Sequence, residues 1–251
     1  MKKILIYRDE GADPFGIGSL VSALRQEKVD QTYLLSWADK SLFQQTAWHK
    51  DTHLIIFPGG RDIPYHQALK GHGNRNLVEF VQGGGYYLGI CAGGYYGCAA
   101  IEFEKDGPLE VLATRELKFF PGIARGPAYG PGKFCYQSGQ GSQIALLEIH
   151  NSPIPSASYF NGGCIFDKAE NYAGISVMAR YADIEGQPAA IVKCSVGAGQ
   201  AILCGVHPEY SAFNLFLKKH LTILLLKKLK EIEKERRNLF INILNELGIR
   251  S

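Results

Sequence analysis

The sequence predicts an α/β protein with a mostly parallel central sheet and helices on both faces of that sheet. Short apolar runs, of the kind found in strands that are covered on both faces, recur through the first hundred residues. Segments with apolar residues at helical spacing separate these runs, and glycine- or proline-rich stretches end them. This alternation of strands and helices is typical of a parallel sheet that lies between layers of helices.

The first hundred residues supply the alternating elements in order. Uninterrupted apolar runs predict strands at 4–7, 31–35, 53–57 and 86–90. Helical spacing predicts a helix over 16–27, a weaker helix over 41–47 and a partly helical segment over 69–82. The glycines at 83–85 end the last of these segments, as glycine commonly does at the end of a helix.

The alternation stops after about residue 100. Glycine, proline and aromatic residues dominate residues 101–143, a composition that is too aromatic for a disordered linker. We expect a β-rich insertion over about 101–170, in which Asn161-Gly162 between apolar runs predicts a hairpin. Further strands are expected at 175–180, 189–194 and 200–205, with residues 197–199 as a hairpin turn.

The C-terminal segment predicts one long helix over 215–247. Its apolar residues form a single stripe from Leu221 to Leu247, and we expect any break to fall near Asn238. The run of charged residues between them predicts a solvated helix face, with a dimer contact or a loose surface association as the alternative. We therefore expect one domain over 1–213 and a helical extension over 214–251 that packs on the same domain.

Composition and charge bound the compartment and the partners. A net charge of +3 is too small to suggest a nucleic-acid partner. Only four apolar residues follow Lys2-Lys3, whereas a signal peptide needs about 7–15. No apolar stretch approaches the roughly 18 residues of a membrane span. We expect a cytoplasmic protein with no nucleic-acid partner and no membrane partner.

The cysteines suggest neither a zinc site nor a disulfide framework. The six residues lie at positions 91, 98, 135, 164, 194 and 204, without a C-x-x-C pair or a histidine at zinc-finger spacing. Cys91 and Cys98 would lie about two helical turns apart, too far to bridge. We expect reduced thiols, no metal and no cofactor.

One cysteine occupies a position that favours reactivity. In Gly89-Ile-Cys-Ala-Gly-Gly94, Cys91 lies at the turn between a predicted strand and a helix-compatible stretch over 92–100. Glycines let strand and helix approach closely there, which is typical of a nucleophile elbow. The N–H groups and the dipole of the following helix would favour a thiolate. The alternative is a small buried apolar residue.

A histidine far along the chain supplies a candidate base. His207 follows a predicted buried strand, and functional residues of parallel sheets gather beyond the C-terminal ends of the strands. Glu209 is placed to orient that imidazole, so Cys91, His207 and Glu209 predict a catalytic triad. The backbone N–H groups of Gly60 and Ala92 are the candidate donors to an oxyanion. Each of these residues, taken alone, has an ordinary structural explanation.

Several stretches in fixed order resemble a known family. They are residues 57–65 (FPGGRDIPY), 87–95 (YLGICAGGY), 115–122 (RELKFFPG), 159–163 (YFNGG) and 205–209 (GVHPE). The chain resembles the class I glutamine amidotransferase-like superfamily and, more closely, the biotin–protein ligase N-terminal domain. The resemblance covers roughly residues 1–210. It implies a flavodoxin-like three-layer α/β fold for the domain over 1–213, and a Cys–His–Glu triad.

Two departures limit what this resemblance implies. Glutamine-using members of the superfamily have the pattern G-x-C-x-G-x-Q, and Tyr95 stands here at the position of that glutamine. Glutamine is therefore in doubt as the substrate. Nothing in the chain resembles the catalytic domain of a biotin ligase or a synthetase domain that would receive ammonia. We expect a free-standing form and do not assign biotinylation to it.

The predicted function is that of a cysteine-dependent hydrolase or amidotransferase-like enzyme that acts on a C–N or related acyl bond. The resemblance places the loops of Asp62, Tyr65, Tyr159 and Asn161 near the site, so these residues are expected to contact a small-molecule or peptide-like substrate. Aromatic packing and turn formation explain them about as well. A non-catalytic ligand-binding or regulatory module and a redox-active thiol protein are the alternatives. For partners, a homodimer is the alternative to a monomer.

Overall fold

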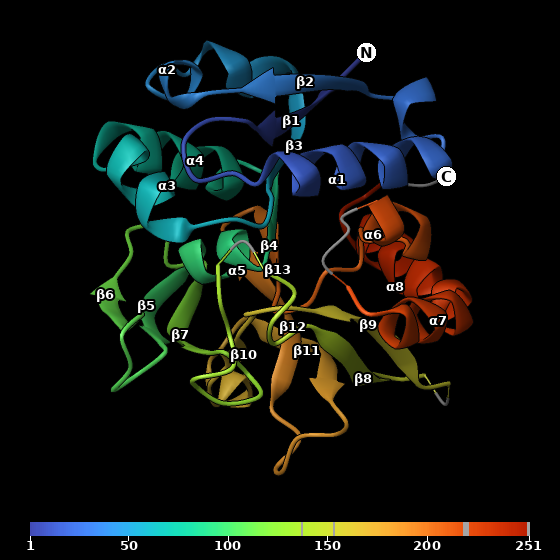
Figure 1. The fold of residues 1–251 in the computed structure, drawn as a ribbon. Coiled ribbons are helices and arrows are strands. Elements are labelled where there is room, and N and C mark those ends of the chain that lie inside the picture. The colour runs from blue at the N-terminus through green and yellow to red at the C-terminus, as the bar shows by residue number, and fades with distance from the viewer. Residues whose placement is uncertain (137, 153, 218–220, 250–251) are drawn as a thin grey trace.

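A single branched sheet organises the chain in the computed structural model, which describes residues 1–136, 138–152, 154–217 and 221–249 (Figure 1). Within these residues the sheet has thirteen strands, ten of which follow the order β2-β1-β3-β4-β13-β12-β10-β7-β5-β6. Three further strands branch from this path, because β11 pairs with β12 and leads through β8 to β9. The predicted α/β class with a mostly parallel central sheet is confirmed.

The half of the sheet that carries the candidate site is parallel throughout. Neighbouring strands pair in parallel from β2 through β1, β3 and β4 to β13. Their bounds are β1 Lys3–Tyr7, β2 Leu34–Ala38, β3 Thr52–Phe57, β4 Tyr86–Ile90 and β13 Gly199–Cys204. The carboxyl ends of β3, β4 and β13 therefore meet at one edge, where Gly59, Cys91 and His207 follow them.

Helices cover both faces of this parallel half. Successive strand residues point to opposite faces, so Ile4 and Ile6 pack with one set of helices while Leu5 and Tyr7 pack with the other. Helices α1 (Pro14–Gln26) and α8 (Glu233–Glu246) bury their apolar residues on the first face. Helices α3 (Asp62–Leu69) and α4 (His72–Gln82) cover the second face, together with the short α2 (Lys40–Phe43).

The other half of the sheet is mainly antiparallel and holds the predicted β-rich region. Its strands are β5 Cys98–Phe103, β6 Val111–Thr114, β7 Phe120–Gly126, β8 Gln143–Ile149, β9 Ser156–Phe160, β10 Ile165–Phe166, β11 Ile175–Tyr181 and β12 Ala189–Val196. Only the β5–β7 pair is parallel among the strands of this half. The hairpin predicted at 197–199 is confirmed, since Val196 pairs with Gly199 between β12 and β13.

Three local predictions in the first two thirds of the chain are wrong. The second strand begins at Leu34 rather than at residue 31, because a short 3-10 helix (Val29–Gln31) occupies that segment. Helix α5 (Ala92–Tyr96) is shorter than predicted, and Cys98 starts β5, where it pairs with Phe120. Residues 161–162 are not a hairpin turn, because β9 pairs with β8 whereas β10 pairs with β7 and β12.

The C-terminal segment forms shorter helices than the single long helix that we predicted. The described residues contain α6 (Ala212–Leu217), α7 (Ile223–Glu231) and α8. The side chain of Thr222 caps α7 by accepting a hydrogen bond from the backbone N–H of Leu225 at 3.2 Å. Asn238 lies inside α8, so the break predicted there is wrong. Residues 218–220 of the predicted helix lie outside the described residues.

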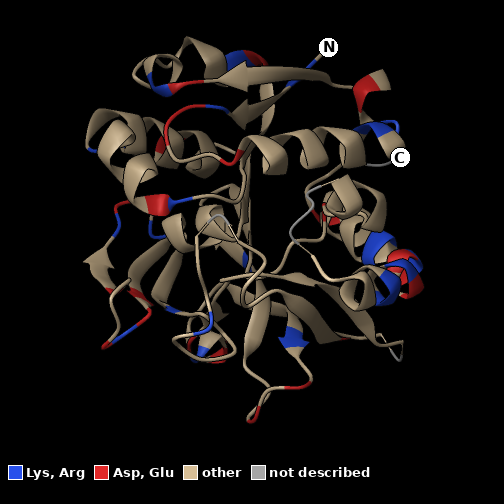
Figure 2. Ribbon diagram, in the orientation of Figure 1, with Lys and Arg blue, Asp and Glu red and all other residues tan. Residues whose placement is uncertain are grey.

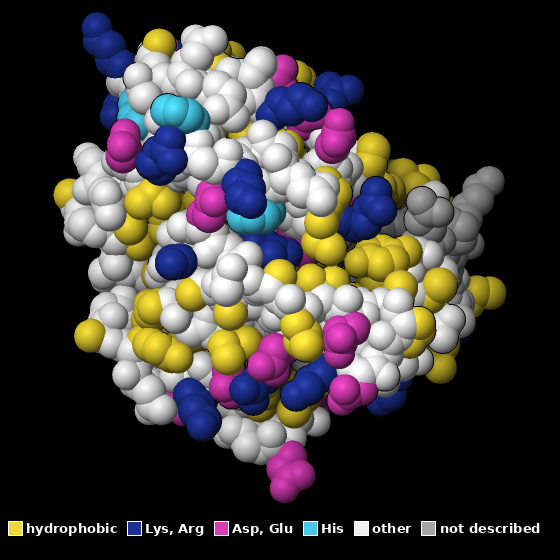
Figure 3. All heavy atoms as spheres, turned by 90° about the vertical axis from the view of Figure 1, so that its left-hand side faces the viewer, with side chains coloured by type: hydrophobic (Ala, Val, Ile, Leu, Met, Phe, Trp, Pro, Cys, Tyr) yellow, Lys and Arg dark blue, Asp and Glu magenta, His cyan; other side chains and the backbone are white. Residues whose placement is uncertain are grey.

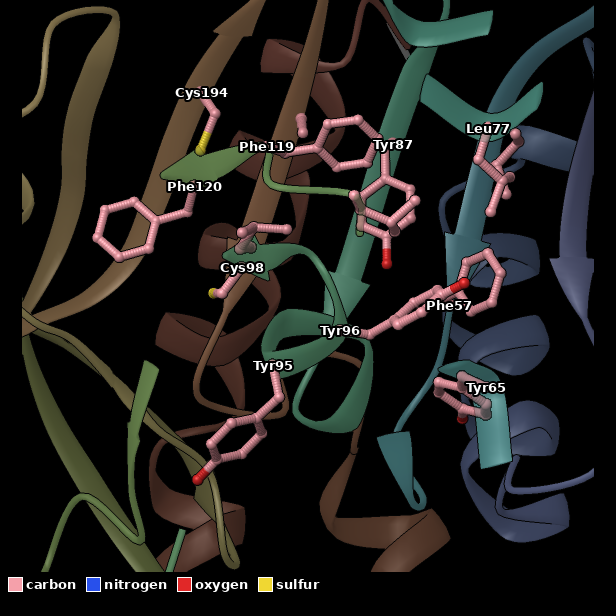
Figure 4. Packing of buried hydrophobic residues seen from close by; sticks show 14 of the residues in the cluster. Phe57, Tyr65, Leu77, Tyr87, Tyr95, Tyr96, Cys98, Phe119, Phe120 and Cys194 are labelled. Carbon is pink, nitrogen blue, oxygen red and sulfur yellow. The ribbon is translucent and has the colours of Figure 1, made fainter. Parts of the chain in front are cut away.

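The core beneath the candidate site is densely aromatic. Figure 4 shows Tyr96 of α5 directed toward Phe57, whereas Tyr95 points away from it. The ring centroids of Phe57 and Tyr96 lie 5.1 Å apart, and those of Phe57 and Tyr87 lie 5.6 Å apart. A Cβ at Gly93 would lie 2.1 Å from the carbonyl oxygen of Phe57, so only glycine lets α5 sit this close to β3.

None of the helices in the described residues has both the length and the apolarity that a bilayer crossing requires.

On the ribbon of Figure 2, Lys and Arg alternate with Asp and Glu over α7 and the start of α8. Leu229 of α7 is nevertheless fully buried with Leu215 of α6, so the charged segment packs on the domain through an apolar side.

Candidate active site

Cys91 lies in a strained turn between β4 and α5. Its backbone has φ 51° and ψ −103°, a conformation that non-glycine residues rarely adopt. Hydrogen bonds on both sides hold this turn: the N–H of Cys91 donates to the carbonyl of Cys204 at 2.8 Å, and its carbonyl accepts from the N–H of Tyr95 at 3.0 Å. The strand–turn–helix arrangement matches the geometry of a nucleophile elbow.

His207 follows β13 and reaches the same edge of the sheet. Its backbone N–H donates to the carbonyl of Tyr159 at 2.9 Å, which ties it to the end of β9. The ring of Tyr210 stacks on the imidazole, with centroids 4.5 Å apart and an interplanar angle of 4°. On another side the imidazole lies against Gly59, where a Cβ would come within 2.8 Å of the histidine Cε1. These contacts fix the orientation of the ring.

Glu209 is the partner of this imidazole. Its Oε1 lies 2.8 Å from Nδ1 of His207, and both side chains are buried. Within the part of the chain that the structure describes, Oε2 of Glu209 has no hydrogen-bond partner. The carboxylate therefore depends on His207 for its compensation, which favours a positive charge on the ring.

The charge state of His207 follows from these neighbours. Burial alone would lower the pKa of His207, but the negative charge of Glu209 and the charge and hydrogen bond of Cys91 together raise it to about 10. The imidazole is then protonated at neutral pH and lies beside the sulfur of Cys91. A cysteine with a hydrogen-bonded imidazolium is the arrangement that stabilises a thiolate nucleophile.

Two backbone N–H groups are available to a developing oxyanion. Within the described residues, no backbone carbonyl accepts a hydrogen bond from the N–H of Gly60 or of Ala92. Both residues line the same cavity as Cys91. Gly60 has φ +145°, and a Cβ there would lie 2.0 Å from the carbonyl oxygen of Gly11, so a side chain at this position is excluded. These donors have the chemistry of an oxyanion hole.

A cavity of about 680 Å³ opens above the sulfur of Cys91. Its volume lies within the range of small-molecule sites, roughly 300–1,000 Å³. The aromatic residues of its wall come from strands, from α5 and from loops: Tyr95, Phe103, Phe134, Tyr136, Tyr159 and Tyr210. Cys91 itself is 8% exposed, and its sulfur lies 3.8 Å from the carbonyl oxygen of Asn161. The thiol therefore borders a cavity whose wall combines aromatic rings with polar and charged side chains.

The four residues predicted as substrate contacts divide into two groups. Asp62, Tyr159 and Asn161 line the cavity, and Tyr159 exchanges a hydrogen bond with Ser142 at 2.7 Å. Tyr65 is not among the residues that line the cavity. It is fully buried, and its hydroxyl donates to the carbonyl oxygens of Pro58 and Gly59 at 3.1 and 3.2 Å. Its position there supports the turn that carries Gly60.

Some residues of the site were not found from the sequence. Tyr210 follows His207 by only three positions, so its closeness along the chain was an available signal. No sequence signal points to the salt bridge between Asp62 and Arg115, whose Nε donates to the carboxylate at 2.8 Å, because the partners are 53 residues apart. The same holds for the loop that brings Phe134 and Ser138 over the cavity.

The site shows no arrangement suited to a metal. Within the described residues, no three His, Cys, Asp or Glu side chains come together as a metal would require. The carboxylate of Asp62 is occupied by Arg115, and that of Glu209 faces His207. The residues that the fold brings together here are a thiol, an imidazole and backbone N–H groups.

Comparison with known proteins gives consistent results. The family model of the biotin–protein ligase N-terminal domain matches residues 2–251. An uncharacterised protein of Chlamydia muridarum is 41% identical over 212 residues, which cover 84% of this chain and 81% of that protein. A biotin–protein ligase of Schizosaccharomyces pombe is 38% identical over 214 residues, which cover 83% of this chain but 33% of the ligase. The chain thus spans about a third of that ligase.

Two solved structures share the fold at low sequence identity. One is a putative ThuA-like protein from Bacteroides uniformis, with a TM-score of 0.54 and 13% identity, covering 87% of this chain and 89% of the other. The second is a cytoplasmic protein from Salmonella typhimurium, with a TM-score of 0.52 and 14% identity, covering 98% of this chain and 99% of the other. At these identities the likeness concerns the fold alone.

Proposed function

The chain belongs to the biotin–protein ligase N-terminal family, and on this premise we propose that it is a cysteine-dependent hydrolase or amidotransferase-like enzyme. Its substrate would contain a C–N or related acyl bond, and the family would fall within the class I glutamine amidotransferase-like superfamily. The observation that carries the proposal is the contact of Cys91, in its strained turn, with an imidazole that Glu209 holds at 2.8 Å.

The proposed reaction has two halves. The thiolate of Cys91 adds to the carbonyl carbon, and the N–H groups of Gly60 and Ala92 stabilise the oxyanion. Protonated His207 donates its proton to the leaving amine as the C–N bond breaks, which leaves a thioester on Cys91. Water then adds to the thioester and gives its proton to neutral His207. Collapse releases the acid and returns the thiolate and the imidazolium.

Glutamine is not the substrate that the cavity favours. Tyr95 stands at the position of the glutamine residue in the G-x-C-x-G-x-Q pattern, and its hydroxyl donates to the carbonyl of Gly162 at 3.1 Å. Tyr95 also lines the cavity, so its ring occupies the wall where glutamine-using members have a glutamine side chain. We therefore propose a different small-molecule or peptide-like acyl substrate. Ligase activity is not proposed, because the chain corresponds to a third of the ligase that it resembles.

The two alternative functions are less well supported. A non-catalytic binding module on this fold has no need of a strained cysteine that faces an oriented imidazolium. A redox-active thiol does not require Glu209 on the far side of the histidine. The partner of such a redox thiol would have to be Cys135, the other cysteine in the cavity wall among the described residues.

The other proposed properties concern location and partners. We propose a cytoplasmic protein that binds neither nucleic acid nor membranes and that is able to form a homodimer. The face drawn in Figure 3 supports the proposal that the protein does not bind nucleic acid. On this face Lys and Arg are scattered among Asp and Glu and form no continuous basic patch. The net charge of +3 agrees with that distribution.

The test is a search for an acyl intermediate on Cys91. The wild-type protein and the Glu209→Gln variant are incubated with a small-molecule extract of cells, and the Cys91 peptide is analysed by mass spectrometry. We expect an adduct that hydroxylamine removes, as it does thioesters, and that accumulates in Glu209→Gln because His207 no longer activates water efficiently. Cys91→Ala is the control and should carry no adduct. An adduct removed only by a reducing thiol would favour the redox protein, and an unreactive Cys91 would favour the binding module.

A further inference from the structure

Among the described residues, the charged side chains in the cavity wall are paired or hydrogen-bonded, with one exception. Asp62 accepts a hydrogen bond from Nε of Arg115 at 2.8 Å. Asp13 caps α1 by accepting from backbone N–H groups at 3.3 and 3.2 Å. His207 has Glu209. The negative charges in the cavity wall are therefore already compensated or engaged.

Arg61 is the exception. Within the described residues its guanidinium has no ion pair and no hydrogen bond, although the residue lines the cavity. The backbone of Arg61 is fixed, because its N–H donates to the carbonyl of Gly11 at 2.8 Å. It directly follows Gly60, the candidate oxyanion donor, and precedes α3. Arg61 is exposed to solvent, so its guanidinium is available to a ligand beside the place where the acyl group would lie.

Two residues across the cavity define what else a ligand would meet. Tyr136 lines the same cavity as Arg61. Burial raises the pKa of Tyr136, the charge of Asp62 adds to this effect, and the charge of Arg61 opposes it. Within the described residues, the buried Oδ1 of Asn161 has no hydrogen-bond partner, whereas its Nδ2 donates to the carbonyl of Ser138 at 3.4 Å. Oδ1 is thus able to accept a hydrogen bond from an N–H group of a ligand.

We propose that the cavity selects acyl compounds that carry a carboxylate, and that Arg61 binds this carboxylate. The planar guanidinium matches a carboxylate with two parallel hydrogen bonds. Oδ1 of Asn161 accepts from an N–H group of the same compound, in keeping with a C–N bond at the reacting carbon. This inference rests on the function proposed above and names the substrate class of that site.

The test compares two alkylating probes of nearly equal size. Iodoacetate and iodoacetamide both lose iodide to the thiolate of Cys91 and form a thioether, but only iodoacetate is an anion. The rate at Cys91 is followed by peptide mass spectrometry, which separates it from Cys135. In Arg61→Gln we expect the iodoacetate rate to fall about fivefold relative to the iodoacetamide rate, the effect of one partly screened charge.

Three further measurements make the result specific. Arg61→Lys keeps the charge, so its ratio of the iodoacetate rate to the iodoacetamide rate should stay close to that of the wild-type protein. Arg75→Gln removes an exposed positive charge outside the cavity wall and should leave the ratio of rates unchanged. Raising the salt concentration should lower the ratio of the iodoacetate rate to the iodoacetamide rate in the wild-type protein. The reason is that the screening length shortens from about 10 Å at 0.1 M to about 3 Å at 1 M.

The outcomes separate this inference from the proposed function. An unchanged ratio in Arg61→Gln, with iodoacetamide still reacting at Cys91, overturns the carboxylate site and leaves the cysteine enzyme standing. An equal fall in Arg75→Gln also overturns it, because the effect would then come from net charge. If neither probe reacts with Cys91 in the wild-type protein, the proposed function fails, and the carboxylate site fails with it.

Discussion

Cys91 and Cys98 lie seven residues apart, yet their surroundings differ in every respect that governs thiol chemistry. Cys91 occupies a turn at the sheet edge, opens to the cavity and contacts His207. Cys98 lies at the start of β5 with no exposed surface, and its thiol donates to the carbonyl of Gly94 at 3.2 Å. Burial raises the pKa of the Cys98 thiol well above its ordinary value. Reactivity is therefore set by position in the fold rather than by residue type.

The remaining buried cysteines belong with Cys98. Cys164, Cys194 and Cys204 have no exposed surface, and burial raises the pKa of each of these thiols. Cys194 and Cys204 lie within β12 and β13, as small apolar residues of the sheet. The difference in thiol reactivity between the edge and the interior of the sheet can be tested by substitutions in each of these two regions.

The largest expected effect is the difference between the two cysteines in labelling. With iodoacetamide at pH 7 under native conditions, we expect Cys91 to react more than about a hundredfold faster than Cys98, because thiolate fraction and access both favour it. Peptide mass spectrometry against time measures both rates in one sample. Cys98→Ala should leave the Cys91 rate unchanged. Comparable rates at the two sites would remove the contrast.

The second prediction concerns the imidazole. His207→Ala removes the positive charge beside the sulfur, so the labelling rate of Cys91 at pH 7 should fall by about tenfold or more. His72→Ala is the matched control, since His72 is an exposed residue at the start of α4 and lies outside the cavity wall. A Cys91 rate that stays at the wild-type level in His207→Ala would mean that the histidine does not activate the thiol.

The third prediction concerns the pH dependence of stability. The folded-state pKa of His207 is raised to about 10 from 6.5. The stabilisation that this shift provides is therefore fully present below pH 6.5 and is lost as the pH rises through about 10. Glu209→Gln removes the main interaction that raises the pKa of His207, so this pKa should fall in the variant. We expect the wild-type protein to lose more unfolding free energy than Glu209→Gln between pH 6.5 and 10.

Denaturant unfolding of both proteins across this pH range measures that difference, and NMR titration of the imidazole assigns it to His207. Equal losses in the two proteins would show that Glu209 does not hold the charge on the ring.

The smallest expected effect comes from the glycine that lies against the histidine. Gly59→Ala would place a Cβ 2.8 Å from Cε1 of His207 and 3.8 Å from Cβ of Cys91. We expect a loss of about 1–3 kcal/mol in unfolding free energy from this overpacking, with slower labelling of Cys91. Gly18→Ala is the control, because nothing lies within 4 Å of its Cβ position in α1. It should stabilise the helix by about 0.5–1 kcal/mol. A neutral Gly59→Ala would contradict the tight contact.

Arg236 shows what lay beyond sequence reasoning. It was part of a charged run expected to be solvated, yet the residue is 1% exposed and its Nη1 donates to the carbonyl of Pro208 at 2.5 Å. Its other nitrogen pairs with Glu233 at 2.6 Å. The C-terminal extension thus contacts the turn between His207 and Glu209. A run of charged residues in the sequence does not show which of those residues will be buried against a turn that is distant in the chain.

The sequence alone determined the elements whose signal is local. Uninterrupted apolar runs gave β1, β3 and β4 nearly in full, and the glycines around Cys91 predicted a strand–turn–helix, because such patterns reflect backbone geometry within a few residues. The hairpin at Asn161-Gly162 failed for the complementary reason. A turn signal describes a reversal of the chain, but pairing across the sheet decided which strands became neighbours.

The tertiary structure alone decided which residues share the cavity. Arg61, Tyr136 and Asn161 come from three separate loops, and no spacing in the sequence relates them. The same is true of the imidazolium charge, which depends on how deeply His207 is buried and on what lies beside it. The pKa of a buried group depends on its distances to other charges and on its exclusion from water. Folding sets both, so the sequence pattern alone does not reveal them.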